Sequence, residues 1–172
     1  MKKIQAHLIG ETIFSNSSEA FSLHKKSHFG EPSGEKVIYS LSEALFLIEE
    51  NKLEVLSQKK ILSFDELMRK SRRFDKKIQI KYPVFKNLRK KGNIVKTALK
   101  FGADFRVYEK GTGPGKKHAK WIVFVDHESK RTSWQDFSAK NRVAHSTKKK
   151  LLIAIVDNEN DVSYYEIKWL KF

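Results

Sequence analysis

The chain of 172 residues is long enough for one large domain or two small ones, and its hydrophobic content of 40% allows a buried core. Its 35 lysine and arginine residues outnumber 20 aspartate and glutamate residues, and the formal net charge of +15 favours a polyanionic partner, such as nucleic acid, over an ordinary metabolite. The absence of cysteine excludes disulfides and thiolate zinc sites.

The positive charge is concentrated in the second half of the chain. Residues 1–77 carry 14 basic and 11 acidic residues, a net charge of +3, whereas residues 78–172 carry 21 and 9, a net charge of +12. We therefore expect the second half to face the polyanion, although a lysine-rich composition also arises in proteins from hot habitats. No apolar run approaches 18 residues and no signal-peptide pattern is present, so we expect a cytoplasmic protein that does not enter a membrane.

Residues 1–40 are predicted to form short strands and loops, because short apolar pieces alternate with turn residues there. A helix over residues 41–51 is predicted to follow. Its start is marked by a capping box, in which Ser40 and Glu43 are spaced to satisfy each other's exposed backbone amides.

A second capping box, formed by Ser63 and Glu66, begins another helix with one apolar face. The basic residues that cluster at positions 69–73 of this helix are interpreted as a solvated face. The charge balance and the order of the elements then change. We therefore expect an N-terminal accessory domain over residues 1–77 and a second domain over residues 78–172.

The second domain is predicted to combine helices with a mixed sheet. One helix begins at Tyr82-Pro83, with the proline in its first turn, and another follows Asn93 and ends before Gly102. A further helix runs from Ser133 to about Thr147. The predicted strands are one that ends at Tyr108, then Trp121–Val125, Leu151–Val156 and Val162–Trp169. These elements predict an α+β fold, with a small mixed N-terminal domain and a C-terminal mixed sheet flanked by helices.

A glycine-rich loop at residues 111–115 connects the first two of these strands. Tyr108 ends the strand before the loop and His118 begins the strand after it, so the loop brings a phenol and an imidazole to the same end of a sheet. RNA can be cut without a metal when one group takes the proton from the 2′-hydroxyl, another protonates the leaving 5′-oxygen, and a cation stabilises the charge on phosphorus. Tyr108, His118 and a lysine from residues 148–150 supply these functions, although each residue type alone is more often a packing or surface residue.

Four segments of the second half, taken in order, carry a family resemblance. They are YPVFKNLRKKG at 82–92, LKFGADFRVYEKG at 99–111, HAKW at 118–121 and RVAHSTKKKLLIAIVDNENDVSYYEI at 142–167. In these segments the chain resembles the archaeal tRNA-intron splicing endonucleases. Residues 1–77 resemble only the smaller, variable N-terminal domain of that family.

The resemblance implies a metal-independent cleavage of precursor tRNA at bulge-helix-bulge splice sites, without a cofactor, that leaves a 2′,3′-cyclic phosphate and a 5′-hydroxyl. It implies Tyr108 as the general base, His118 as the general acid and Lys149 as the cation that stabilises the transition state, with Lys148 and Lys150 as competing assignments. Because an ordinary tyrosine is a weak base at neutral pH, the positive charge of Lys149 is expected to favour its anion.

The resemblance also implies how the substrate is held and how subunits assemble. Arg142 matches an arginine that stacks on a flipped intron base, a role suited to a planar cation. The acidic turn with Asp157, Glu159 and Asp161 matches a loop that inserts into a basic cleft of another subunit, and C-terminal strands pair subunits by their edges. The resemblance therefore implies a homotetramer or a heterotetramer with a structural subunit.

Two alternatives remain open. Asp104, Glu128 and Lys130 have the residue types of a magnesium-dependent nuclease, in which carboxylates hold the metal and a lysine assists. The other alternative is a noncatalytic RNA-binding or structural subunit of the same assembly. The presence of suitable residues at all three catalytic positions argues against this second alternative.

Overall fold

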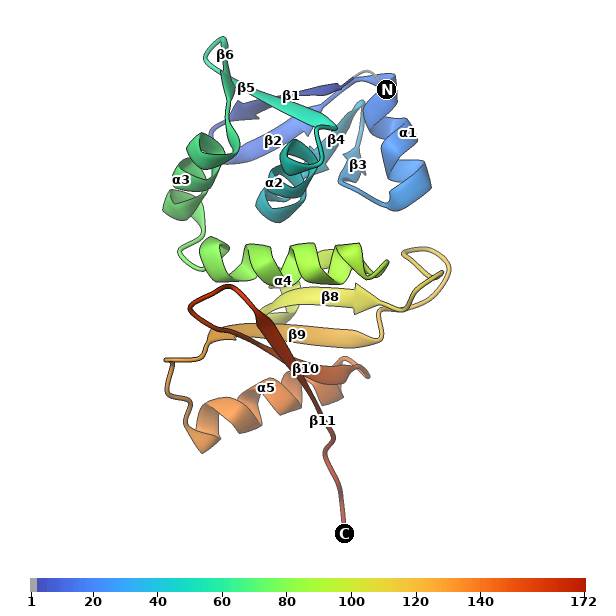
Figure 1. The fold of residues 1–172 in the computed structure, drawn as a ribbon. Coiled ribbons are helices and arrows are strands. Elements are labelled where there is room, and N and C mark those ends of the chain that lie inside the picture. Colours follow the sequence, from blue (N-terminus) through green and yellow to red (C-terminus); the bar gives the residue numbers. More distant parts are fainter. Residues whose placement is uncertain (1–2) are drawn as a thin grey trace. The chain divides into compact units, whose positions relative to one another are not determined.

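A computed structural model of the chain describes residues 3–172 (Figure 1). The chain divides into two compact units, one up to Tyr82 and one from Pro83. Each unit combines helices with one β-sheet, which confirms the predicted α+β class. The change of unit falls inside helix α4 (Ile78–Lys90), and the domain division predicted after residue 77 stays a prediction.

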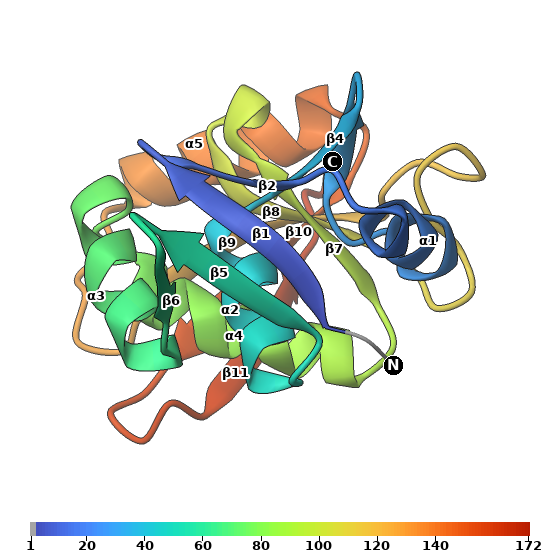
Figure 2. The same cartoon turned by 90° about the horizontal axis from the view of Figure 1, so that it is seen from above.

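The first unit is built on a six-stranded sheet with the order β3-β4-β2-β1-β5-β6. Strand β1 lies between β2 and β5, antiparallel to the former and parallel to the latter (Figure 2). The strands are β1 (Ile4–Ile9), β2 (Thr12–Ser15), β3 (Glu31–Ser33), β4 (Lys36–Tyr39), β5 (Leu53–Ser57) and β6 (Lys60–Leu62). The helices are α1 (Ser18–Ser27), α2 (Leu41–Glu49) and α3 (Phe64–Phe74).

The two predicted capping boxes are confirmed. At the start of α2, Ser40 Oγ accepts from the amide of Glu43 (3.4 Å), and Glu43 Oε2 accepts from the amide of Ser40 (3.0 Å). At the start of α3, Ser63 and Glu66 make the same reciprocal pair, at 3.2 and 2.9 Å. Because these bonds satisfy amides that a helix leaves unpaired, both helices begin where the sequence predicts.

The prediction of short strands and loops for residues 1–40 missed helix α1. The helix buries only Ala20 and Leu23, so its apolar periodicity is weak. The signal that could have found it is the N-cap, because Ser17 Oγ accepts from the amide of Ala20 at 3.2 Å, and Glu19 follows in the first turn.

The second unit contains a five-stranded mixed sheet with the order β11-β10-β9-β8-β7. Strands β9 and β10 are parallel, and the other neighbouring pairs are antiparallel. The strands are β7 (Ile94–Ala98), β8 (Ala103–Tyr108), β9 (Trp121–His127), β10 (Lys150–Val156) and β11 (Val162–Ile167). Helix α5 (Trp134–Ser146) packs on β9 and β10, and a short 3₁₀ turn, η1 (Leu99–Phe101), precedes β8. These elements confirm the predicted helix after Ser133 and the C-terminal hairpin.

Two sequence predictions in this region were wrong. The helix predicted after Asn93 is strand β7, whose residues pair with β8 from Ile94 opposite Tyr108 onward. The apolar positions fit a helical spacing, but the pairing partner lies further along the chain and decides the outcome. Helix α4 begins before Tyr82, so Pro83 lies inside it rather than in its first turn.

Candidate active site

Tyr108 is fixed at the end of strand β8. Its side chain is 4% exposed, and its backbone carbonyl accepts a hydrogen bond from Asn93 Nδ2 at 2.9 Å. Within residues 3–172 the Tyr108 hydroxyl has no hydrogen-bond partner. The phenol is therefore held by its backbone and its packing, and its hydroxyl is available to a ligand.

His118 is positioned by a loop that is itself hydrogen-bonded. The Gly113 carbonyl accepts from the amides of Lys116 and Lys117, both at 3.1 Å, and the amide of Lys120 donates to the carbonyl of Val107 at 2.9 Å. Gly115 has φ +84°, a conformation that disfavours residues with a Cβ. His118 is exposed and lies in this loop shortly before β9, rather than at the first position of the strand as predicted.

Lys149 is placed by the way helix α5 ends. The amide of Lys148 donates to the carbonyl of His145 (3.0 Å), and the amide of Lys149 donates to the carbonyl of Ala144 (2.9 Å). Lys148 has φ +54°, so these bonds form a Schellman motif with a lysine where glycine is usual. The motif turns the chain from α5 into β10. The ammonium of Lys149 donates to the carbonyl of Thr147 at 3.0 Å and lies 5.7 Å from the centre of the Phe101 ring.

The register of three strands brings these residues to one end of the sheet. Val107 of β8 pairs with Trp121 of β9, which pairs with Lys150 of β10. Tyr108 directly follows the first of these residues, and Lys149 directly precedes the last. The residues that the sequence analysis selected from three separate segments therefore lie together.

A cavity of about 310 Å³ opens at this end of the sheet. Tyr108, His118 and Lys149 all line it. The other lining residues are Phe101, Arg106, Pro114, Gly115, Lys117 and Ala119. No described residue that lines the cavity is acidic, so its chemistry suits an anionic group such as a phosphodiester.

The two competing lysines have different surroundings. Lys150 Nζ contacts Glu166 Oε1 at 2.9 Å, and Trp121 Nε1 donates to Glu166 Oε2 at 2.8 Å. The hydrogen bond from Lys150, followed by that from Trp121, lowers the pKa of Glu166 below its usual value. Lys148 is exposed and does not line the cavity. Lys149 is therefore the only lysine of this triplet among the described lining residues.

Arg106 and Lys117 line the cavity and were missed by the sequence analysis. Arg106 precedes Tyr108 by two positions in a strand, which places both side chains on the same face. That alternation is the signal that could have identified it. Lys117 directly precedes His118, but the local pattern of a loop does not predict where its side chain points.

Arg142 lies on helix α5, where it is exposed, and it is not among the residues that line the cavity. The acidic turn between β10 and β11 is exposed at Glu159 and Asp161. Asp157 has a structural function in this turn, because its Oδ1 accepts from the amides of Glu159 and Asp161, both at 2.9 Å. The turn therefore presents two exposed carboxylates on a backbone that the third carboxylate organises.

The alternative metal-site residues make separate contacts. Asp104 Oδ2 accepts from the amide of Val125 at 2.7 Å, and Lys130 Nζ contacts Asp126 Oδ1 at 2.6 Å. Glu128 is exposed. Among residues 3–172, no group of three or more carboxylate or histidine side chains is arranged to hold a metal ion.

Asp126 is a buried carboxylate that the sequence analysis did not select. Its second oxygen contacts Lys140 Nζ at 2.5 Å, which ties the end of β9 to α5. Burial raises the pKa of Asp126, but hydrogen bonds from Lys130 and Lys140 outweigh this effect and hold the pKa below its usual value. Asp126 therefore anchors the helix that carries Arg142.

Two family models match the chain, one within the first unit and one that begins a few residues before the second unit and otherwise lies within it. A model described as "tRNA intron endonuclease, catalytic C-terminal domain" matches residues 78–164, and one described as "tRNA intron endonuclease, N-terminal domain" matches residues 4–68. A tRNA-splicing endonuclease of Pyrococcus abyssi is 42% identical over 174 residues and covers 100% of both chains. A tRNA-splicing endonuclease of Thermococcus onnurineus is 44% identical over 98% of both chains. A tRNA-splicing endonuclease of Nanoarchaeum equitans is 41% identical over 76% of this chain and 88% of its own length.

The mixed sheet, the basic cavity and these matches define an endonuclease. The chain belongs to the tRNA intron endonuclease family.

Asp126→Asn tests the anchor of α5. Because the folded-state pKa of Asp126 is lowered, its ion pairs stabilise the protein above the pKa of the unfolded carboxyl and lose that contribution as the pH falls through the folded pKa. We expect the variant to be less stable at pH 7 by about 2–3 kcal/mol, with a smaller difference below about pH 4. Urea unfolding at both pH values measures this, with Glu128→Gln as a neighbouring exposed control. A difference that does not change with pH would contradict the ion-pair explanation.

Proposed function

We propose that this endonuclease excises introns from precursor tRNA by metal-independent cleavage at bulge-helix-bulge splice sites, giving a 2′,3′-cyclic phosphate and a 5′-hydroxyl. The observation that carries the proposal is that Tyr108, His118 and Lys149 all line one basic cavity. The names of the relatives, tRNA-splicing endonucleases, support the choice of substrate.

Each residue has one step in the proposed reaction. Tyr108 accepts the proton of the 2′-hydroxyl, and the 2′-oxygen forms a bond with phosphorus while the bond from phosphorus to the 5′-oxygen breaks. His118, in its protonated form, gives its proton to the leaving 5′-oxygen. Lys149 stabilises the charge that gathers on the phosphoryl oxygens. Both nucleophile and leaving group belong to the RNA, so the proposed reaction requires no cofactor.

Arg106 and Lys117 extend this proposal to substrate positioning. Both line the same cavity as the three proposed catalytic residues, and both carry positive charge next to the space where the phosphodiester would lie. We assign them to binding the phosphate rather than to proton transfer, because guanidinium and lysine ammonium groups remain protonated at neutral pH.

The proposed substrate also requires recognition of unpaired bases. Arg142 is exposed on α5 and has a planar cation that can stack on a base displaced from a helix. A bulge provides such a base, whereas a continuous duplex does not. We therefore propose Arg142 as a substrate-binding residue outside the catalytic cavity.

We further propose assembly into a tetramer, with a second copy or a related structural subunit as the partner. Strand β11 is the last strand of its sheet, so one of its edges has no neighbouring strand among the described residues. Tyr165 in this strand and Trp169 just beyond its end are each 58% exposed. An edge-to-edge contact here and insertion of the acidic turn elsewhere would give two interfaces of different kinds, as a dimer of dimers requires.

The part of the chain that the structure describes, residues 3–172, contains no helix long and apolar enough to span a membrane.

His118→Ala is expected to reduce cleavage of an intron-containing precursor tRNA by about 10²–10⁴-fold with little change in RNA affinity, because it removes a proton donor. Tyr108→Phe and Lys149→Ala should also reduce the rate, whereas Lys148→Ala should not. Single-turnover assays in excess chelator, with analysis of the product ends, measure these effects. If chelator abolished cleavage and magnesium restored it, the magnesium-dependent mechanism with Asp104, Glu128 and Lys130 would explain the activity better.

Arg142→Ala is expected to weaken binding of bulged RNA by roughly 5- to 150-fold, since base stacking on a side chain is worth about 1–3 kcal/mol. Arg142→Lys keeps the charge and loses the planar stacking surface, so it should behave like the alanine variant. Binding assays with a bulged RNA and with a fully paired duplex measure the difference. Full recovery by the lysine variant, or an equal loss on both RNAs, would rule out stacking.

Glu159→Lys combined with Asp161→Lys is expected to split a tetramer into dimers and abolish cleavage, because it reverses the exposed charge of the acidic turn. Asp157 stays unchanged because it holds the turn. Glu35→Lys combined with Glu128→Lys makes the same change in net charge at other exposed positions and should have no such effect. Light scattering measures the mass. A tetramer of unchanged mass, or a fully active wild-type monomer, would refute the proposed interface.

A further inference from the structure

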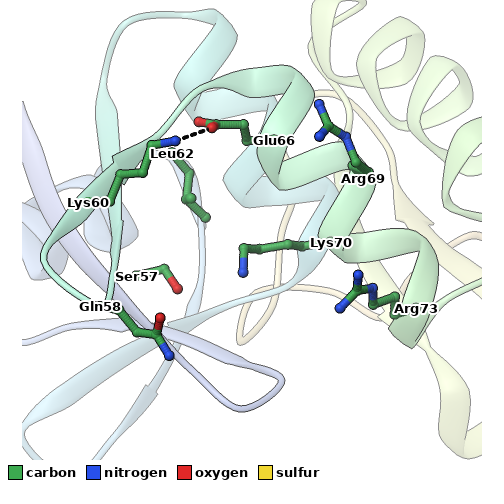
Figure 3. A pocket seen from close by; sticks show the side chains of 8 residues that line it. All are labelled: Ser57, Gln58, Lys60, Leu62, Glu66, Arg69, Lys70 and Arg73. Carbon is green, nitrogen blue, oxygen red and sulfur yellow. Dashed lines mark hydrogen bonds and ion pairs between the residues drawn. The ribbon is translucent and has the colours of Figure 1, made fainter.

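The first unit contains a second basic cavity, of about 490 Å³, between helix α3 and the turn that joins β5 to β6 (Figure 3). We call it the α3 groove. Its lining residues are Ser57, Gln58, Lys60, Leu62, Glu66, Arg69, Lys70 and Arg73. All of them belong to one unit, so the groove shares no residue with the cavity that holds Tyr108.

The positive charge of the α3 groove is not compensated. Within residues 3–172, Arg69, Lys70 and Arg73 make no ion pair or hydrogen bond through their side chains. Glu66, the only acid among the described lining residues, is already bound by Lys60 Nζ at 2.5 Å. The hydrogen bond from Lys60, together with that from the Ser63 amide, lowers the pKa of Glu66 to about 2. Glu66 is thus ionised and occupied, and three cations are left for an external anion.

The concentration of charge is local. Positions 69–73 hold four of the 14 basic residues found in residues 1–77, a stretch whose net charge is only +3. Two of them, Arg72 and Arg73, lie in the last turn of α3, where cations favour the helix dipole. The dipole gives no comparable reason for Arg69 and Lys70, which come before that turn.

The geometry of the groove fits a chain of anions. Arg69 and Arg73 are one helical turn apart, about 6 Å along the axis of α3, with Lys70 between them. Figure 3 shows Lys70 and Arg73 extending from α3 toward Ser57 and Gln58. The turn opposite is fixed, because Gln58 and Lys59 have φ +48° and +68°, the left-handed pair typical of a tight hairpin. A hydroxyl and an amide therefore face the cations across the groove.

A neighbouring cavity of about 380 Å³ extends this surface. It shares Ser57, Gln58, Lys70 and Arg73 with the α3 groove and adds Leu8, Ile9, Gly10 and Phe74. Phe74 is 38% exposed, and it directly follows Arg73 in the chain. Cations beside an exposed aromatic ring are the combination that holds single-stranded RNA, with phosphates on the cations and a base on the ring.

We propose that the α3 groove binds the phosphodiester backbone of the RNA substrate, as a second RNA contact outside the catalytic cavity. This inference rests on the proposed RNA substrate. It assigns the basic face of α3 a function, in place of the simple solvated face that the sequence indicates. An acidic protein segment, such as the acidic turn of a second copy, suits the groove less well, because it would leave the exposed ring of Phe74 without a stacking partner.

The test compares Lys70→Gln/Arg73→Gln with Lys25→Ala/Lys26→Ala in the full chain. The first variant replaces two charged side chains of the groove with shorter, uncharged polar ones, and the second removes two exposed charges from the end of α1 in the same unit. The probe is a precursor tRNA with 2′-deoxyribose at both cleavage sites, which stays intact because it has no attacking hydroxyl. Affinity is measured from 50 to 300 mM salt, because binding that depends on phosphate contacts weakens steeply as the salt concentration rises through about this range.

We expect the groove variant to bind this RNA roughly 5- to 30-fold more weakly at low salt, and the slope of log affinity against log salt to fall by about 2. The α1 variant should bind as the wild type does. With cleavable RNA, the groove variant should show a raised KM and an unchanged kcat, because the groove does not touch the reacting atoms. Phe74→Ala should weaken binding of an unpaired strand more than binding of a duplex.

Equal losses in the groove and α1 variants would overturn the proposal, since charge alone would then explain them. Unchanged RNA affinity in the groove variant would also overturn it, and a simultaneous fall in mass by light scattering would identify a second copy as the occupant. Failure of the proposed function would be recognised separately, because the wild type would then not cut the unmodified precursor tRNA. The comparison is valid when the variant and the wild type have the same melting temperature in thermal denaturation. Lys70→Ala/Arg73→Ala serves as a second variant for the same comparison.

Discussion

The hydrogen-bonded register of β8, β9 and β10 is the constraint on which the catalytic cavity depends. Val107, Trp121 and Lys150 lie in one row across the sheet, so Tyr108 and Lys149 lie at the same end of the sheet, with β9 between their strands, although they are far apart in sequence. A slip of one residue in either pair would turn alternate side chains to the opposite face and separate the phenol from the ammonium. The buried residues of β9, which have almost no exposed surface from Ile122 to Val125, make such a slip costly.

The fold could be predicted from sequence wherever the information was local. The capping boxes at Ser40 and Ser63 predicted two helix starts, because their bonds join residues three positions apart. Strand β7 was predicted as a helix since its partner, β8, lies beyond it in the chain, and Ile94 pairs with Tyr108 rather than with a local residue. The wrong start of α4 has the same cause, because a proline inside a helix is tolerated when tertiary contacts outweigh the lost hydrogen bond.

The candidate site divides in the same way. Motif spacing selected Tyr108 and His118, and the structure places both on one cavity. The family resemblance favoured Lys149 among three consecutive lysines, and the backbone geometry at the end of α5, where Lys148 occupies the left-handed position, is the reason that Lys149 lines the cavity. The pairing of Asp126 with Lys140 could not be predicted, because it joins a strand to a helix through side chains that carry no common motif.

The acidic turn has a thermodynamic consequence for any encounter with a partner. Asp157 holds the amides of Glu159 and Asp161, and the amide of Asn160 donates to the carbonyl of Asp157 at 3.2 Å. The backbone of the turn is thus ordered when the chain folds, and the loss of conformational entropy occurs then rather than at association. A preorganised turn retains more of its interaction energy as affinity, and its complexes form without a loop-ordering step that would slow them.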